Sequence, residues 1–267
     1  MPLLLTIMLF AAFGGIASAA FAVIFIWIPE ARSGRILPHF VSFATGALLG
    51  AALLALLPEA FEQAGPHRAR AIGLTVIIGL GVFYVIEKLV LWWHEHSHED
   101  ELAHHAVGDG HAAHDPRAHA SGVLVLIGDS VHNALDGVLI AAAFLTSVPL
   151  GLVTTVAVAA HEVPHRVGDF AILVHAGFTR RRALLLNLAT GLASVAGAVA
   201  AYYALRQAFG ALPYALAFAA AGFLYIAVAG LIPGLHRRSD PVTSAMQVLL
   251  ITLGIAVIAL AERLSGR

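Results

Sequence analysis

The chain lacks cysteine altogether, and charged residues make up only 12% of its 267 residues. The absence of cysteine excludes disulfide bonds and thiolate metal ligands. The scarcity of charge argues against a soluble domain, in which about 25% of residues are charged on average. A formal net charge of −1 provides no reason to expect nucleic-acid binding. Since 60% of the residues are hydrophobic, the composition predicts an integral membrane protein in contact with the lipid bilayer.

The apolar residues gather in eight runs, each near the roughly 20 residues that a helix needs to cross a bilayer. A very short connection at Ser147-Val148-Pro149 makes the fourth and fifth helices antiparallel neighbours. We therefore predict an all-α membrane protein with a single polytopic transmembrane domain over residues 1–267. The eight transmembrane helices are predicted at residues 3–28, 36–62, 71–93, 121–146, 149–176, 183–208, 211–233 and 242–263.

The second and seventh runs resemble each other without a gap when Phe43 is aligned with Phe218. Because these runs lie five helices apart, they would cross the membrane in opposite directions, as in transporters built from inverted repeats. This predicts a 3+2+3 arrangement in which the fourth and fifth helices form the central pair and carry the binding site. The alternative is that the similarity between these Ala- and Leu-rich helices arises by chance. The matching pairs are Ala44/Ala219, Leu49/Leu224, Ala52/Ala227, Leu56/Leu231 and Pro58/Pro233.

The fourth run contains the polar pattern His132-Asn133-x-x-Asp136 within an otherwise apolar segment. Polar side chains inside a membrane are costly and require a partner, a cavity or a bound ion. At about 100° per residue, the three side chains fall within about 100° of arc on a helix. Asp129 lies inside the same arc, almost one turn earlier. One face of this helix is therefore predicted to be polar.

The fifth run carries a second polar face, formed by His161, Glu162, His165 and Asp169. Pro164 removes one backbone hydrogen bond from this helix, which is tolerated beside a cavity or an ion site. The two faces together offer imidazoles, carboxylates and an amide, a mixed set that suits zinc or another divalent transition metal rather than calcium or magnesium. Asp129 and Asp169 either line the path of the metal or pair with a cation.

Two motifs, His132-Asn133-Ala134-Leu135-Asp136-Gly137 and His161-Glu162-Val163-Pro164-His165, are followed by Gly168-Asp169-Phe170. This combination resembles the ZIP (Zrt/Irt-like) divalent metal transporters, in particular the subgroup with histidine-rich loops. The resemblance extends over nearly the whole chain and implies the same 3+2+3 arrangement, in a homodimer. It also implies that the main metal is held by His132, Asp136, His161 and His165, with Asn133 and Glu162 contributing to an adjoining second site.

The sequence departs from the family pattern at several positions. Arg166 stands where the subgroup usually has a second Glu, and Ser194 lies near the position at which members outside the subgroup have a Glu in the sixth helix. These two departures concern the second site. His175 is either a ligand on the exit path or an ordinary interfacial histidine. Ala51 and Ala55 replace an Asp and a His, and Gly230 and Gly234 replace acidic residues.

The segment 94–120 is the only long polar stretch and contains eight of the fifteen histidines. Its mixture of histidine and acidic residues is typical of a disordered loop that binds metal weakly, with a solvated linker as the alternative. The basic run Arg180–Arg182 marks a cytoplasmic boundary, so we predict a cytoplasmic loop and both termini outside. The histidines of this loop are His94, His96, His98, His104, His105, His111, His114 and His119.

We therefore predict a transporter, not an enzyme, that moves zinc into the cytoplasm across the plasma (inner) membrane; Fe, Co, Ni, Cd and Mn are alternative ions. An intramembrane zinc metalloprotease is a second reading, since His161-Glu162-x-x-His165 also matches the H-E-x-x-H pattern. Pro164 within that turn argues against a protease. The order of the motifs does so too, because the aspartate motif of site-2 proteases lies downstream of H-E-x-x-H, whereas Leu135-Asp136-Gly137 lies upstream. A membrane metal sensor that transports nothing is the third reading.

Overall fold

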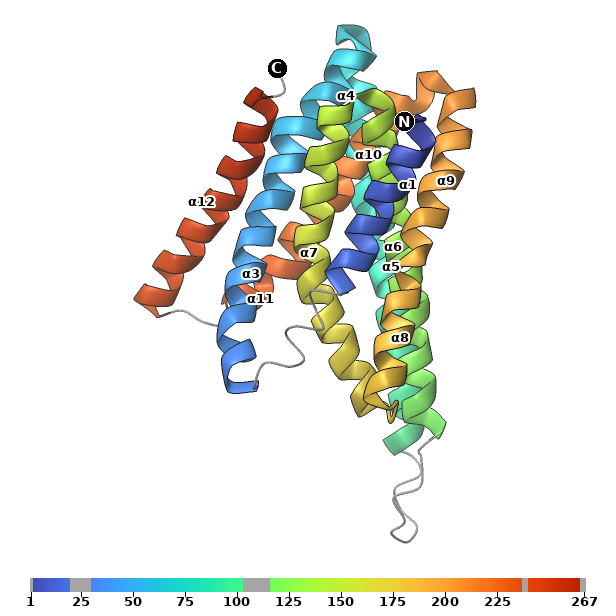
Figure 1. Ribbon diagram of the computed structural model, residues 1–267, viewed down its shortest axis with the longest axis vertical. Coiled ribbons are helices and arrows are strands. Elements are labelled where there is room, and N and C mark those ends of the chain that lie inside the picture. The colour runs from blue at the N-terminus through green and yellow to red at the C-terminus, as the bar shows by residue number, and fades with distance from the viewer. Residues whose placement is uncertain (1, 20–29, 103–115, 237–239, 265–267) are drawn as a thin grey trace, which may run out of the picture.

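The computed structural model describes residues 2–19, 30–102, 116–236 and 240–264, and these residues are almost entirely helical, without a strand (Figure 1). The prediction of an all-α protein is confirmed. The helices are α1 (Leu3–Ala12), η1 (Phe13–Ala17), α3 (Glu30–Gly50), η2 (Ala51–Leu56), α4 (Leu57–Ala64), η3 (Pro66–Arg68), α5 (Ala69–Leu102), α6 (Pro116–Thr146), α7 (Val148–His175), α8 (Arg180–Thr190), α9 (Leu192–Gln207), η4 (Phe209–Ala211), α10 (Leu212–Tyr225), η5 (Ile226–Leu231), α11 (Ile232–His236) and α12 (Pro241–Leu264).

Six helical stretches of the described residues are long and apolar enough to cross a membrane: Ile36–Ala64, Pro66–Leu89, Val125–Thr146, Arg180–Gln207, Phe209–His236 and Pro241–Leu264. Two of the eight predicted helices are not among them. The first predicted helix is described as a short apolar helix, Leu3–Ile16, and residues 20–29 lie outside the described ranges. α7 has 28 residues, but its polar face lowers its hydropathy.

Several predicted boundaries differ from those of the structure. The predicted loop 94–120 is helical at both ends, because α5 continues to Leu102 and α6 begins at Pro116, while residues 103–115 are not described. Nothing in the sequence of 94–102 breaks a helix, since it contains neither Gly nor Pro. The predicted helix 183–208 is divided at Gly191 into α8 and α9.

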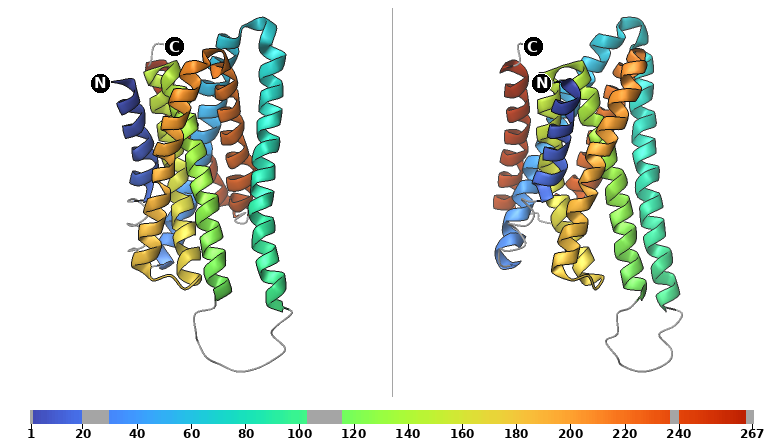
Figure 2. Two further views of the ribbon diagram at one scale, coloured as in Figure 1. Left: turned by 90° about the vertical axis from the view of Figure 1, so that its right-hand side faces the viewer. Right: turned by 45° about the vertical axis from the view of Figure 1, so that its right-hand side comes forward.

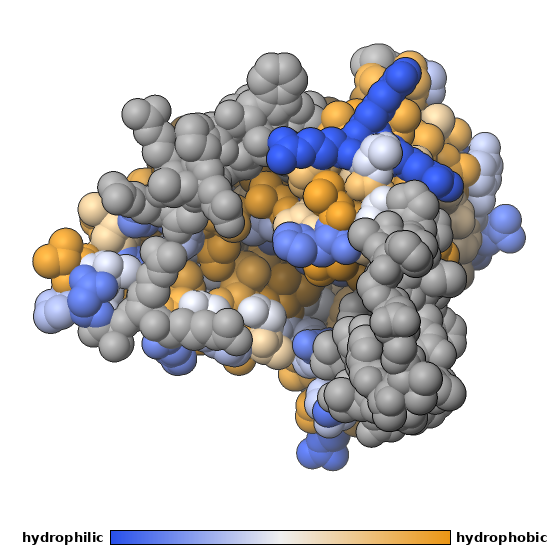
Figure 3. All heavy atoms as spheres, turned by 90° about the horizontal axis from the view of Figure 1, so that it is seen from below, coloured by the Kyte–Doolittle hydropathy of each residue, from blue (hydrophilic) through white to orange (hydrophobic). Residues whose placement is uncertain are grey.

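The helices run along a common direction, and α1 begins at the end of the bundle where α12 finishes (Figure 1). The end of α5, the start of α6 and the junction between α7 and α8 lie at the opposite end (Figures 1 and 2). Viewed from that end, extended hydrophilic side chains project from the surface (Figure 3). Arg180, Arg181 and Arg182, at the start of α8, are exposed.

α6 packs against α7 on one side and α9 on another. A Cβ atom on Gly137 would lie 1.8 Å from the backbone oxygen of Ser194, and one on Gly197 would lie 2.0 Å from that of Ala134. The two backbones are therefore in direct contact, which only glycine permits at these two positions. This contact places α9 immediately behind the polar face of α6.

Two further helix pairs, α3 with α12 and α10 with α5, pack in corresponding ways. A Cβ atom on Gly254 of α12 would contact Phe43 and Gly46 of α3, and one on Gly79 of α5 would contact Phe218 and Ala221 of α10. The alignment of Phe43 with Phe218 also matches the bounds of two π-helical segments, η2 (Ala51–Leu56) and η5 (Ile226–Leu231). The first and last residues of η2 correspond to those of η5 in that register.

Candidate metal centre

The site lies between α6 and α7, which are antiparallel neighbours as predicted from their short connection (Figure 1). Ser147 ends the connection and caps α7, since its hydroxyl accepts a hydrogen bond from the backbone N–H of Leu150 at 3.3 Å. Pro149 occupies the first turn of α7, where its missing N–H costs nothing. The turn therefore brings the two polar faces opposite each other.

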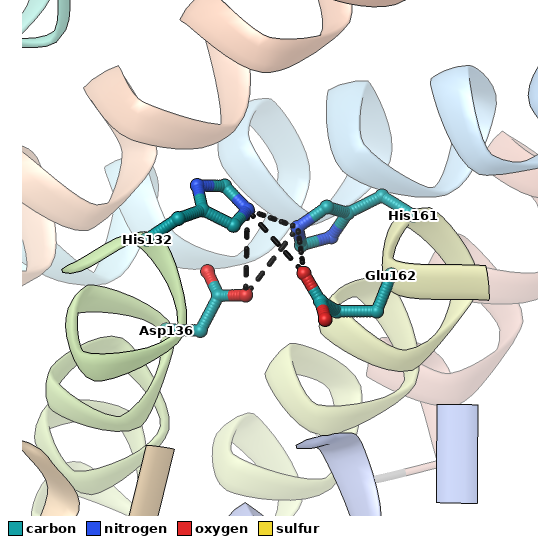
Figure 4. A group of neighbouring side chains, drawn as sticks. All are labelled: His132, Asp136, His161 and Glu162. Atoms are coloured by element: carbon teal, nitrogen blue, oxygen red, sulfur yellow. Dashed lines mark hydrogen bonds and ion pairs between the residues drawn. The ribbon is translucent and has the colours of Figure 1, made fainter. Parts of the chain in front are cut away.

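Four side chains converge at the centre of this interface: His132 and Asp136 from α6, and His161 and Glu162 from α7 (Figure 4). The Nε2 atoms of His132 and His161 are 3.2 Å apart. Nε2 of His132 lies 3.4 Å from Oε1 of Glu162 and 3.8 Å from Oδ2 of Asp136. Nε2 of His161 lies 3.4 Å from Oδ2 of Asp136 and 3.8 Å from Oε1 of Glu162.

These separations match those among the ligands of a tetrahedral zinc ion. With bonds of about 2.0 Å, the ligand atoms of such an ion lie about 3.3 Å from one another. In the part of the chain that the structure describes, Oδ2 of Asp136 and Oε1 of Glu162 are buried without a hydrogen-bond partner. Buried carboxylate oxygens require compensation, and a divalent cation between the four side chains would provide it.

The orientation of the His161 ring also suits metal binding. Its Nδ1 lies 3.1 Å from the backbone oxygen of Ala157. Because a carbonyl oxygen only accepts hydrogen bonds, Nδ1 is the donor of this contact and Nε2 is the ring nitrogen that faces the other three side chains. A backbone carbonyl that orients a metal-binding imidazole in this way is common at metal sites.

A second group lies one turn further along the two helices and consists of Asp129, His165 and Asp169. Nδ1 of His165 is 2.9 Å from Oδ2 of Asp169 and 3.8 Å from Oδ1 of Asp129. The His165 ring stacks on that of His132, with 5.2 Å between the ring centres. His165, predicted to hold the main metal, thus lies beside the first group, with its Nδ1 directed to Asp169.

Asn133 and Arg166 form a polar contact beside the first group. Nη2 of Arg166 donates to the side-chain oxygen of Asn133, and the amide nitrogen of Asn133 donates to Oδ1 of Asp129 at 2.8 Å. The side chain of Asn133 is thereby directed to Arg166 and Asp129 rather than to the first group. Ser194 is buried, in contact with α6 at Gly137.

A family model described as ZIP zinc transporter matches residues 2–262. The chain belongs to the ZIP family. Zinc transporter ZIP13 of Homo sapiens is 36% identical over 267 aligned residues, covering 86% of this chain and 72% of the human protein. Zinc transporter SLC39A7 of Mus musculus is 32% identical over 325 aligned residues, covering 93% of this chain and 68% of the mouse protein.

Membership of the ZIP family makes this protein a membrane transporter rather than an enzyme, and it disfavours the protease reading. The ZIP motifs that carried the predicted resemblance are the residues that the structure brings together at the α6–α7 interface. His175 belongs to neither group: it is exposed near the end of α7, with Nδ1 2.8 Å from the backbone oxygen of Ala171.

Sequence reasoning missed Asn187 and Thr190 of α8, whose side chains contact the guanidinium group of Arg166. Both are buried. Their spacing of three residues on an apolar helix was a signal, since polar side chains at i and i+3 share one helix face. That spacing indicates a polar helix face, but it does not identify Arg166 as the residue that this face contacts.

Proposed function

We propose that this ZIP protein moves zinc down its gradient into the cytoplasm through the site between α6 and α7. The observation that carries the proposal is the first group, in which two imidazole nitrogens lie within 4.8 Å of two buried carboxylate oxygens that have no hydrogen-bond partner among the described residues. Imidazole and carboxylate also suit Fe, Co, Ni, Cd and Mn, but the tetrahedral spacing favours zinc.

We assign the ligands as His132, Asp136, His161 and Glu162, with His165 as a further ligand when its ring approaches the ion. The bond from Nδ1 of His165 to Asp169 supports this role, because a histidine that donates one ring N–H to a carboxylate is oriented to bind metal through the other nitrogen. Asp129 and Asp169 then line the route on the side of the second group.

We also propose the eight-helix, 3+2+3 arrangement with inverted repeats. The matching positions of η2 and η5 support it, as do the corresponding glycine contacts of α12 with α3 and of α5 with α10. In this arrangement the predicted helix 3–28, which begins with α1, and α7 are the two crossings that complete the set of eight. α6 and α7 are the central pair, and they carry the site, as in other transporters whose repeats surround a central binding site.

The proposed orientation has both termini outside and the histidine-rich segment in the cytoplasm. The exposed run Arg180–Arg182 lies at the same end of the bundle as the last turn of α5 and the first turn of α6 (Figure 1). Basic residues favour the cytoplasmic side, which supports the assignment of that end to the cytoplasm.

We further propose a homodimer in the plasma (inner) membrane. The mass of the protein in detergent tests the dimer, and cell fractionation tests the location.

Zinc flux into liposomes tests the central proposal. The purified protein is reconstituted, zinc is added outside without ATP, and a zinc-sensitive dye inside reports uptake. We expect uptake with the unmodified protein and none with empty vesicles or with the His132→Ala variant. Zinc binding without flux would support the sensor reading, and peptide cleavage without flux would support the protease reading.

A further inference from the structure

Four carboxylates lie buried along the interface of α6 and α7, and none is more than 6% exposed: Asp129, Asp136, Glu162 and Asp169. A buried negative charge inside a membrane requires a positive partner. Among the described residues, the only buried side chain with a permanent positive charge is that of Arg166, which is 0% exposed. The position of this one cation therefore decides which carboxylates remain for an incoming ion.

Arg166 forms ion pairs with one carboxylate from each of the two groups. Its Nε lies 2.9 Å from Oε2 of Glu162, which belongs to the first group. Its Nη1 lies 3.0 Å from Oδ2 of Asp129, which belongs to the second group. The guanidinium group thus lies between the two sets of metal-binding side chains and contacts both.

Three helices hold the guanidinium group in this position. From α6, Asn133 accepts a hydrogen bond from Nη2. From α8, Nη1 meets the hydroxyl of Thr190 and, at 2.9 Å and 2.6 Å, the side-chain and backbone oxygens of Asn187. Asn187 in turn donates from its amide nitrogen to the backbone oxygen of Arg166 in α7 at 2.9 Å. These neutral contacts hold both terminal nitrogens of the planar group in place.

The contacts leave one place at the interface without positive charge. Asp129 is paired with Arg166, and Asp169 contacts Nδ1 of His165 at 2.9 Å. Glu162 uses Oε2 for Arg166 and keeps Oε1 directed at the two imidazoles of the first group. Oδ2 of Asp136 and Oε1 of Glu162 are buried without a hydrogen-bond partner among the described residues, and both face the imidazoles of the first group.

We propose that Arg166 is a tethered cation that occupies the space between the two groups, so that each protomer binds a single divalent ion, at the first group. Arg166 also positions Glu162 so that its Oε1 faces that ion. The proposal rests on the proposed function, because it assumes that the first group binds zinc. Removal of the charge at residue 166 should open a second zinc position between Glu162 and Asp129.

Anomalous X-ray scattering from zinc-soaked crystals of the full chain tests this proposal. We expect one zinc peak at the first group in the unmodified protein and in Arg166→Lys, which keeps the charge. Arg166→Gln should show a second peak between Glu162 and Asp129. Arg206→Gln is the matched control, because it removes the same charge at the end of α9, where the guanidinium group lies over the Tyr202 ring.

Zinc counted by mass spectrometry in the same preparations provides a second readout, with one more ion per protomer expected in Arg166→Gln than in Arg166→Lys. A merely structural role of Arg166 would change stability without adding an ion. Two equally occupied peaks in the unmodified protein would overturn the proposal, as would a single peak in a folded Arg166→Gln protein. If Arg166→Gln does not fold, the peaks of the unmodified protein decide. Zinc flux measured in parallel separates this result from failure of the proposed function, which would show as no flux and no peak at the first group.

Discussion

Glu162 and Arg166 lie one helical turn apart on α7 and form an ion pair in which Oε2 and Nε are 2.9 Å apart, while the other carboxylate oxygen of Glu162 lies 3.4 Å from Nε2 of His132. One carboxylate thus serves both an internal cation and the ligand group. The ion pair fixes the direction of Glu162 in the absence of metal. Preorganisation of this kind reduces the ordering that a ligand must undergo when an ion binds.

Replacement of His132 or His161 by Ala should nearly abolish zinc transport, and His165→Ala should do the same if its Nε2 joins the site. These imidazoles supply bonds that replace the hydration of the ion. Asp169→Ala should leave a measurable rate, because loss of a group that orients a ligand typically costs 10–100-fold in affinity. Dye-reported uptake in liposomes measures each rate.

His175→Ala is the matched control for this series, since His175 lies on the same helix, exposed and outside both groups. Its rate should equal that of the unmodified protein. Unchanged uptake by the His132→Ala protein would show that the first group is not the transport site.

Deletion of residues 95–119 should preserve zinc transport and reduce the number of weakly bound ions. A histidine-rich segment attracts metal ions weakly, and the first group, which we assign to transport, lies outside it. Isothermal titration of the intact and shortened proteins measures the bound ions, and liposome uptake measures transport. Complete loss of flux in a well-folded shortened protein would instead assign this segment to the transport path.

Gly137→Ala should destabilise the protein, because its Cβ atom would lie 1.8 Å from the backbone oxygen of Ser194. Overpacking of this kind typically costs about 1–3 kcal/mol, and here it would separate α6 from α9. The melting temperature in detergent, followed by the fraction that elutes as folded protein, reports the change. Gly81→Ala is the control, since nothing lies within 4 Å of a Cβ atom there. Equal melting temperatures for the two variants would contradict the close packing of α6 and α9.

Single cysteines should report the orientation of the chain, because the natural sequence has none to remove. His67→Cys, in η3 (Pro66–Arg68), and Arg181→Cys, at the start of α8, place exposed thiols at opposite ends of the bundle (Figures 1 and 2). A membrane-impermeant maleimide added to intact cells should label the first variant and spare the second until the cells are opened. The reverse pattern would invert the proposed orientation.

The sequence alone was sufficient for the membrane class and for the two polar faces. Helical periodicity determines the direction in which each side chain leaves its own axis, and the length of the connection at Ser147 decides that α6 and α7 are neighbours. For that reason the spacing and the ZIP motifs could single out His132, Asp136, His161 and Glu162, the four side chains that the structure brings together.

The tertiary structure decided which polar residues belong to the first group and which to the second. Periodicity says nothing about the offset between two helices along their axes, or about side-chain rotamers. Spacing along one helix allows Arg166 to reach Glu162 at i−4 or Asp169 at i+3. The partners found are Glu162 and, across the interface, Asp129. Only the relative placement of α6, α7 and α8 brings Asn187 and Thr190 to the same guanidinium group, and it directs Nδ1 of His165 to Asp169.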